Sequence, residues 1–293
     1  MLVQLLANGF SNGLMIALMA AGFALIYNTT RVFHVAHGAV YVLAAYTYYA
    51  LSQRLLLPKP LAVGATLLVA ALFGAAIESF IYAPLYRKQA PQIVSLLSSF
   101  GLYVAIVNCI AMFFGNEIQV VPAIRGAAIQ FGPILIARIQ IVEGAVSILT
   151  LVPLTVFLWR SEWGRLIRAT RDNPQLVAAM GTDLLSIRRL VFVIGSGLAG
   201  IAAILSVVDV GADPQSGMPA FLIATVAVIV GGLGSFGGAI LGSIVVAVLQ
   251  SLAVWRVSPR WSDAITFAIL ILFMVFRPTG LIGSRRRIEE AID

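Results

Sequence analysis

Two histidines, His34 and His37, are the side chains of this sequence most suited to metal binding or proton transfer. They lie three residues apart, so in a helix they would share one face and could hold a metal ion or relay a proton. No third ligand stands at a metal-binding spacing, and a histidine at the end of a membrane segment more often satisfies a backbone carbonyl. The sequence leaves both interpretations open and predicts no metal site.

One acidic residue, Glu78, lies inside an apolar segment, residues 61–82. Burying an acidic side chain inside a membrane segment costs free energy, so such a residue is first considered as part of a functional site. Glu78 is about one turn from the end of its segment, where a long basic side chain can reach it. We therefore favour a structural ion pair with Arg87 or Lys88.

The run GLGSFG at 232–237 matches the dinucleotide-binding fingerprint formally. That fingerprint requires a preceding strand, a βαβ unit and a ribose-binding acid, and the sequence offers none of these. The sequence also contains no G-x-x-x-x-G-K-[ST] motif, so it has no P-loop of its own for ATP. We predict no cofactor and no enzymatic activity; an embedded enzyme would have only the two histidines as catalytic groups.

The composition identifies the environment of these residues. The 293 residues are 60% hydrophobic and 11% charged, and the mean hydropathy is +1.00. Soluble domains carry about 25% charged residues. We predict an all-α polytopic membrane protein with about eight or nine transmembrane or re-entrant helices, in one integral-membrane domain over 1–293. The net charge of +7 comes from loops at the membrane face and gives no case for nucleic acid.

The predicted apolar segments are 2–27, 36–53, 61–82, 93–114, 142–159, 190–208, 220–230, 239–255 and 261–276. Short alternating runs broken by glycine and proline predict a small extracytoplasmic hairpin within 115–140. Two segments, 36–53 and 219–238, could each span or re-enter the membrane. The second belongs to a glycine-rich broken helix, 219–255, and irregular backbone at membrane depth must be buried in protein or line a cavity.

The longest polar run, 160–189, carries six arginines and three acids, which places it in the cytoplasm. Asn173 can cap a short helix, Pro174 suits its first position, and Gly181 can close it.

Leu176, Val177 and Met180 fall on one face of that helix. This face could lie on the membrane or press into a partner protein.

Four signatures resemble the permease subunits of branched-chain amino-acid ABC importers, of the LivH type. RVFHVAHG at 31–38 is similar to the family's R-x-I-N-F-A-H-G, with His34 where the family usually has Asn. Residues 78–87 resemble E-x-x-x-Y-R-P-L-R, with Ala83 replacing the first arginine. The central run is similar to G-R-x-x-R-A followed by M-G, and GGLGSFGG resembles a G-G-x-G-S segment. The likeness extends from about residue 13 to residue 281.

The resemblance implies that the central run couples the permease to an ATPase. The residues it assigns to this coupling, together with the helix cap, are Gly164, Arg165, Arg168, Asn173, Leu176, Val177, Met180 and Gly181. It implies a bacterial inner-membrane permease that moves branched-chain or other aliphatic amino acids by alternating access. The implied partners are a second homologous permease subunit, two cytoplasmic ATPase subunits, a soluble extracytoplasmic substrate-binding protein and the lipid bilayer.

The alternative function is an ion-coupled secondary carrier for a small polar solute, which also uses broken helices. Such carriers usually keep an ionisable relay at mid-membrane, whereas the acids of this sequence lie near the predicted segment ends.

Paired glycine breaks in two halves of a transporter point to its substrate path. We therefore predict that Gly38, Gly234 and Gly237 lie close to the path, with His34 and His37 at its cytoplasmic edge. The alternative is that these glycines serve helix packing alone. The distribution of Lys and Arg predicts a cytoplasmic C-terminus and an extracytoplasmic N-terminus.

Overall fold

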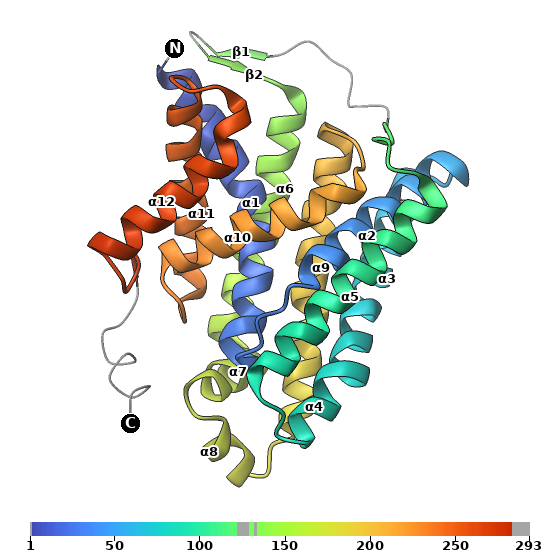
Figure 1. Ribbon diagram of the computed structural model, residues 1–293, viewed down its shortest axis with the longest axis vertical. Helices are drawn as coiled ribbons and strands as arrows, with labels where there is room; N and C mark the ends of the chain where they lie inside the picture. The colour runs from blue at the N-terminus through green and yellow to red at the C-terminus, as the bar shows by residue number, and fades with distance from the viewer. Residues whose placement is uncertain (1, 122–128, 132–133, 283–293) are drawn as a thin grey trace.

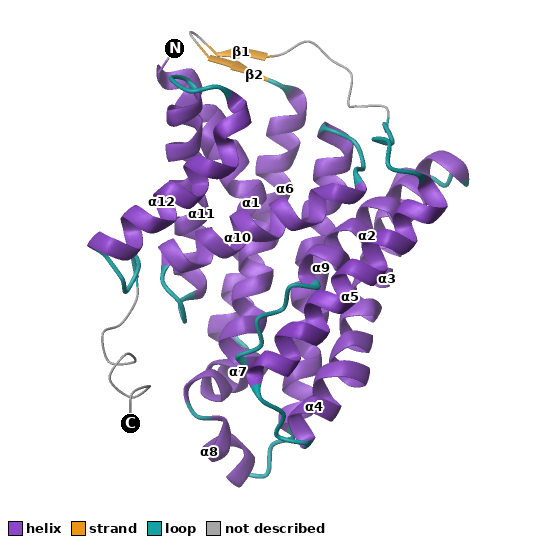
Figure 2. Cartoon of the chain, viewed as in Figure 1, coloured by secondary structure: helices purple, strands orange, loops and turns teal. Residues whose placement is uncertain are grey.

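The computed structural model describes residues 2–121, 129–131 and 134–282, and most of these residues are helical (Figures 1 and 2). The elements are α1 (Leu2–Thr30), α2 (His37–Tyr49), α3 (Lys59–Ile77), α4 (Ala83–Arg87), α5 (Gln92–Phe114), β1 (Ile129–Phe131), β2 (Ile134–Ile136), α6 (Arg138–Arg160), α7 (Glu162–Asp172), α8 (Pro174–Ala179), α9 (Leu184–Asp209), α10 (Gly217–Gly231), α11 (Phe236–Val254) and α12 (Ser262–Phe276). Single π-helical turns follow α2 (Ala50–Arg54) and α3 (Glu78–Tyr82), and 3-10 turns precede α10 (Pro214–Ser216) and α12 (Pro259–Trp261).

Seven helical segments of the described chain are long and apolar enough to cross a membrane. They are α1, α3 with its continuation through α4, α5, α6, α9, α10 with its preceding turn, and α11. Helix α12 is apolar but shorter, and α2 continues through its π-helical turn. The prediction of an all-α polytopic membrane fold is therefore confirmed.

Helix α1 runs through the middle of the bundle, between α11 and α9 (Figure 1). Its 29 residues include no charged side chain. Glycines bring its backbone close to both neighbours. A Cβ on Gly13 would lie 2.8 Å from Cα of Ile244 in α11, and one on Gly22 would lie 2.7 Å from the carbonyl oxygen of Gly195 in α9. Close backbone approach of this kind stabilises helix pairs in membranes.

The chain between α1 and α3 crosses the bundle in two parts (Figure 1). Residues 31–36 run back into the bundle without regular structure, and α2 completes the crossing. At its far end, the Arg54 guanidinium lies 4.6 Å from the ring centroid of Phe114, the last residue of α5. The segment 36–53 therefore extends from the middle of the bundle to the end where α5 ends. Four residues of the irregular part, Val32, His34, Val35 and Ala36, are buried, whereas Arg31 and Phe33 are exposed. Irregular backbone at membrane depth must be buried in protein or line a cavity.

The glycine-rich segment folds as two helices, α10 and α11, joined by the turn 232–235. The helices touch backbone to backbone: a Cβ on Gly231 would collide with the carbonyl of Gly238, and one on Gly242 with the carbonyl of Ala227. Any larger residue at these glycines would force α10 and α11 apart. The predicted break within 219–255 is present.

The two ends of the bundle carry different structures (Figure 1). At one end, β1 and β2 form the small antiparallel hairpin that was predicted, with Ile129 opposite Ile136. Gln4 of α1 exchanges two hydrogen bonds of 2.7 Å with the backbone of Leu135, so the start of α1 belongs to this hairpin end. Helices α7 and α8 lie at the opposite end, here called the α8 end.

Candidate functional site

The polar run 160–189 begins as a tight bend between α6 and α7 at the α8 end. Ser161 caps α7, because its Oγ accepts a hydrogen bond of 2.9 Å from the Gly164 N–H. Gly164 is required here, since a Cβ would collide with the carbonyl of Leu158 in α6. The bend therefore fixes the direction in which α7 leaves the bundle.

Helix α8 has the local geometry that its sequence predicts. The Asn173 Oδ1 accepts a hydrogen bond of 3.0 Å from the Leu176 N–H, and Gly181 closes the helix with φ +81°. Leu176 is 58% exposed and Met180 is 77% exposed, whereas Val177 is 4% exposed. The exposed apolar face thus consists of Leu176 and Met180. Val177, which we expected on that face, instead anchors α8 to the buried core.

The two arginines assigned to coupling have different surroundings. Arg165 makes a 3.5 Å ion pair with Glu162, and both side chains are exposed, so this pair contributes little stability. The Arg168 guanidinium lies over the Trp159 ring, 5.1 Å from its centroid. This cation–π contact holds Arg168 against α6.

Asp183 caps α9, which begins just after the α8 loop. Its carboxylate accepts a hydrogen bond of 2.6 Å from the Ser186 hydroxyl and one of 3.0 Å from the Leu185 N–H. These bonds stabilise the ionised carboxylate, the side-chain bond most, and lower the pKa of Asp183. The cap therefore contributes stability at pH values above the ordinary carboxyl pKa. This contribution is lost as the pH falls through the lowered pKa of Asp183.

A cavity of about 410 Å³ lies at the α8 end, between α1, α6, α7 and the α10–α11 turn. Arg168, Gly234 and Gly237 line it, together with Leu25 and Trp159. A Cβ on Gly237 would meet nothing within 4 Å. Two of the five residues predicted near the substrate path, Gly234 and Gly237, therefore meet at one cavity.

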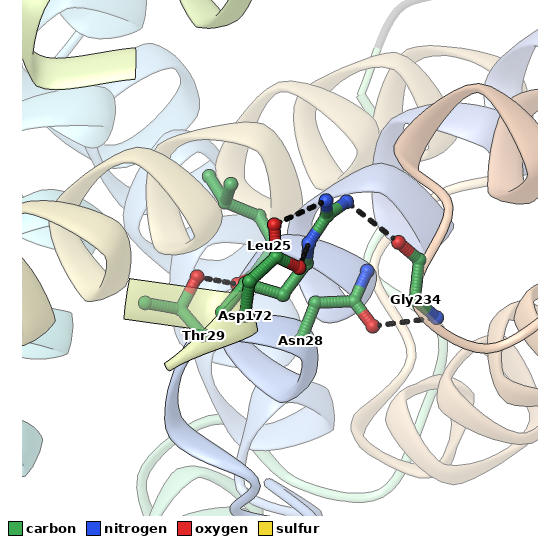
Figure 3. A network of polar contacts seen from close by, with 6 residues as sticks. Leu25, Asn28, Thr29, Asp172 and Gly234 are labelled. Carbon is green, nitrogen blue, oxygen red and sulfur yellow. Dashed lines mark hydrogen bonds and ion pairs between the residues drawn. The ribbon is translucent and has the colours of Figure 1, made fainter. Parts of the chain in front are cut away.

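A polar network holds the turn beside this cavity (Figure 3). The Gly234 N–H donates to Oδ1 of Asn28 in α1 at 2.9 Å, and the Gly234 carbonyl accepts from Nη1 of Arg171 in α7 at 2.9 Å. Arg171 also donates through Nε to Oδ1 of Asp172 at 3.0 Å. Sequence reasoning missed Asn28 and Arg171, because no local pattern brings residues so far apart together.

His34 and His37 lie in the centre of the bundle and are fully buried. The His34 Nδ1 is 2.9 Å from the Tyr82 hydroxyl, and the His37 Nε2 is 3.3 Å from the Met19 carbonyl oxygen. The two ring centroids are 5.8 Å apart. His37 thus bonds a backbone carbonyl, which is the structural interpretation considered above, and the described residues form no cluster of three ligands around it.

Gly38 lies at a helix contact and not at the cavity. A Cβ there would lie 2.7 Å from the carbonyl oxygen of Gly217, the first residue of α10. The structure therefore separates the five predicted path residues into two groups: Gly234 and Gly237 at the cavity, and His34, His37 and Gly38 inside the core.

Glu78 is fully buried and pairs with Arg188 of α9, at 2.6 Å between Oε1 and Nε. The expected pairing with Arg87 or Lys88 is wrong. A buried carboxylate requires a buried cation, and Arg188, with a side chain 6% exposed, lies across the α3–α9 contact. The Arg188 guanidinium also lies 4.6 Å from the centroid of the Tyr86 ring.

Comparison with known proteins gives concordant results. Residues 5–274 match the family described as the branched-chain amino acid transport system permease component. The high-affinity branched-chain amino acid transport system permease protein BraD of Pseudomonas aeruginosa is 30% identical, and the match covers 98% of this chain and 97% of BraD. The corresponding Escherichia coli protein, LivH, is 27% identical, with 98% of this chain and 97% of LivH covered.

Among solved structures, PsaBC from Streptococcus pneumoniae in complex with a Fab has a similar fold. The TM-score is 0.51 at 15% identity, and the match covers 98% of this chain and 94% of the other. At this identity the likeness concerns the fold alone.

Proposed function

Because this chain belongs to the family of branched-chain amino acid transport permease components, we propose that it is the membrane-spanning subunit of an ABC importer for branched-chain or other aliphatic amino acids. The observation that carries this proposal is α8, a capped helix at one end of the bundle with two exposed apolar side chains, Leu176 and Met180. The sequence has no P-loop, so an importer of this kind would take the energy of ATP hydrolysis from another subunit. Helix α8 is a suitable docking point for that subunit.

We propose that α8 contacts one of two cytoplasmic ATPase subunits, and that a second homologous permease and a soluble extracytoplasmic substrate-binding protein complete the importer. ATP-driven closure of the ATPase pair would then rock the helices between inward-open and outward-open states. Residues 1–293 would act as a single permease domain in the inner membrane of a bacterium.

The distribution of charge supports one orientation in the membrane. The α8 end carries the run with six arginines and three acids, which favours the cytoplasm. The hairpin end, with the start of α1, would then be extracytoplasmic and the C-terminus cytoplasmic.

For the substrate path, we propose that Gly234 and Gly237 border its cytoplasmic mouth, because both line the 410 Å³ cavity. His34, His37 and Gly38 would support the path from within, by fixing the irregular stretch that precedes α2.

Transport by the reconstituted complex tests the coupling assignment. We expect the double substitution Leu176→Asp and Met180→Asp to lower ATP-driven leucine uptake at least about tenfold, because two charges replace the apolar docking face. Uptake of radiolabelled leucine into proteoliposomes measures this, with isoleucine, valine and urea as competitors that define the cargo. Gln175→Asp is the matched control, since it adds a charge at another exposed position of α8.

Normal uptake and normal ATPase binding by the double variant would refute the role of α8. Uptake that needs an ion gradient and no ATPase would instead support an ion-coupled carrier. Cargo capture by the separate binding protein should be unchanged in every variant.

A further inference from the structure

We propose that Arg171 and Asn28 form a latch that makes the α10–α11 turn move together with α7 and α8, with Arg171 as the positioning residue. This inference rests on the proposed function, because it concerns how movement of α8 reaches the cavity. The latch consists of Arg171, Asp172, Asn28 and Gly234. Figure 3 labels the last three of these residues.

Both backbone polar groups of Gly234, its N–H and its carbonyl, are hydrogen-bonded to side chains. Asn28 accepts its N–H and Arg171 donates to its carbonyl, each at 2.9 Å. Gly234 has φ +95°, a conformation that residues with a Cβ rarely adopt. The glycine therefore offers both backbone groups to two different helices, α1 and α7, in a way another residue would not.

Arg171 is oriented for this contact by its neighbour. Its Nε and Nη2 donate to the two carboxylate oxygens of Asp172 at 3.0 and 3.3 Å, which leaves Nη1 for Gly234. A planar guanidinium can make these bonds at once, whereas a lysine ammonium cannot match this geometry. The side chain acts as a rigid bridge between α7 and the turn.

Arg171 is also close to the docking helix. Asn173 is the single residue between α7 and α8: its N–H bonds the Ala169 carbonyl at 2.8 Å, and its side chain caps α8. A displacement imposed on α8 would therefore pass directly to the last turn of α7, where Arg171 lies.

On the other side of the latch, the turn cannot move as a free loop. The N–H groups of Leu281 and Ile282 donate to the carbonyls of Val230 and Gly231 at 2.9 and 3.0 Å, and α10 and α11 touch through glycine backbone. Pulling on Gly234 would thus displace the ends of both helices. Because Gly234 also lines the cavity, the latch links α8 to the width of that cavity.

The test uses the complete complex in proteoliposomes and compares leucine transported per ATP hydrolysed. We expect Arg171→Gln and Asn28→Ala to lower this ratio at least about tenfold, while ATP hydrolysis stimulated by the binding protein stays within about twofold of wild type. Arg171→Lys should give an intermediate ratio, because lysine keeps the positive charge but lacks the planar set of N–H donors of the guanidinium. Arg277→Gln, which removes an exposed cation at the same end, is the control and should leave the ratio unchanged.

Thermal unfolding of the assembled complex separates a latch from a merely structural contact. A latch predicts a low transport ratio at nearly wild-type stability for Arg171→Gln. The inference is overturned if the ratio stays at the wild-type value in both variants, or if it falls only in proportion to lost stability. If wild-type complex itself shows no ATP-driven transport, the proposed function fails, and that outcome is distinct from failure of the latch.

Discussion

Single residues inside this bundle show how a membrane protein accommodates polar groups. Glu78 has Arg188, His34 has Tyr82, and Asn28 has Gly234. Each partner lies far away in the sequence. Each side chain is buried. Leaving such a group unpaired would destabilise the protein, because the membrane interior holds no water to hydrogen-bond it.

The pair of Glu78 and Arg188 gives the first prediction at this scale. We expect Glu78→Gln to lower the free energy of unfolding by about 3–5 kcal/mol, because it leaves a buried guanidinium without its counter-charge. Thermal unfolding in detergent measures the loss. Glu162→Gln is the matched control: that side chain is 88% exposed, so its change should be below about 0.5 kcal/mol.

Removing both charges tests the reason for the loss. Glu78→Leu combined with Arg188→Met should recover much of the stability, since a packed apolar pair carries no desolvation cost. If Glu78→Gln were as stable as wild type, the carboxylate would not be neutralising Arg188, and the ion pair would have no structural role.

The same pair shows the limit of prediction from one sequence. Glu78 was recognised as an acid that needs a cation, and the candidates chosen were the nearest in sequence, Arg87 and Lys88. The actual partner is 110 residues away. Nothing local marks Arg188, because its position opposite Glu78 exists only after α3 and α9 pack.

At the scale of elements, local signals were sufficient. The cap at Asn173, the first-turn Pro174 and the left-handed Gly181 depend on neighbouring residues alone, and all three are present. The hairpin and the break between α10 and α11 were predictable for the same reason. The burial of Val177 was not, because it depends on what α8 packs against.

Glycines at helix contacts and glycines at the cavity should respond differently to substitution, which gives a second prediction. Gly237→Val should lower transport while the unfolding temperature stays near the wild-type value, because its side chain would enter the cavity without meeting a neighbour. Gly38→Val should lose stability and transport together, since its side chain would meet the Gly217 backbone.

Gly231→Ala is a positive control for packing loss, because even one methyl would collide with the Gly238 carbonyl. Unfolding temperature and leucine uptake, both measured on the complete complex of each variant, separate a role in helix packing from a place on the substrate path. Full transport by a stable Gly237→Val complex would mean that the cavity lies off the path.

At the scale of the whole molecule, six of the seven long helices of the described chain were recognisable from hydropathy. Helix α10 was expected only as a short apolar half, 220–230, and the course of residues 31–54 was left open. From the sequence alone, an extended stretch followed by a short helix is compatible with a re-entrant loop and with a single crossing. In the structure Arg54 reaches the end of α5, which favours a single crossing. The whole topology depends on this point, because a re-entrant segment would reverse the sides of everything that precedes it.

Cysteine labelling in cells tests this topology as a unit. In a Cys109→Ser background, single cysteines at Leu2, Leu55 and Gln175 occupy exposed positions at the start of α1, after α2 and in α8. We expect a membrane-impermeant maleimide to label the first two from outside and the third only after the membrane is opened, because the α8 end carries the excess of arginine. If residue 2 were labelled from the same side as residue 175 while residue 55 stayed on the opposite side, the stretch 31–54 would be re-entrant, and α1 would enter the membrane from the cytoplasmic side.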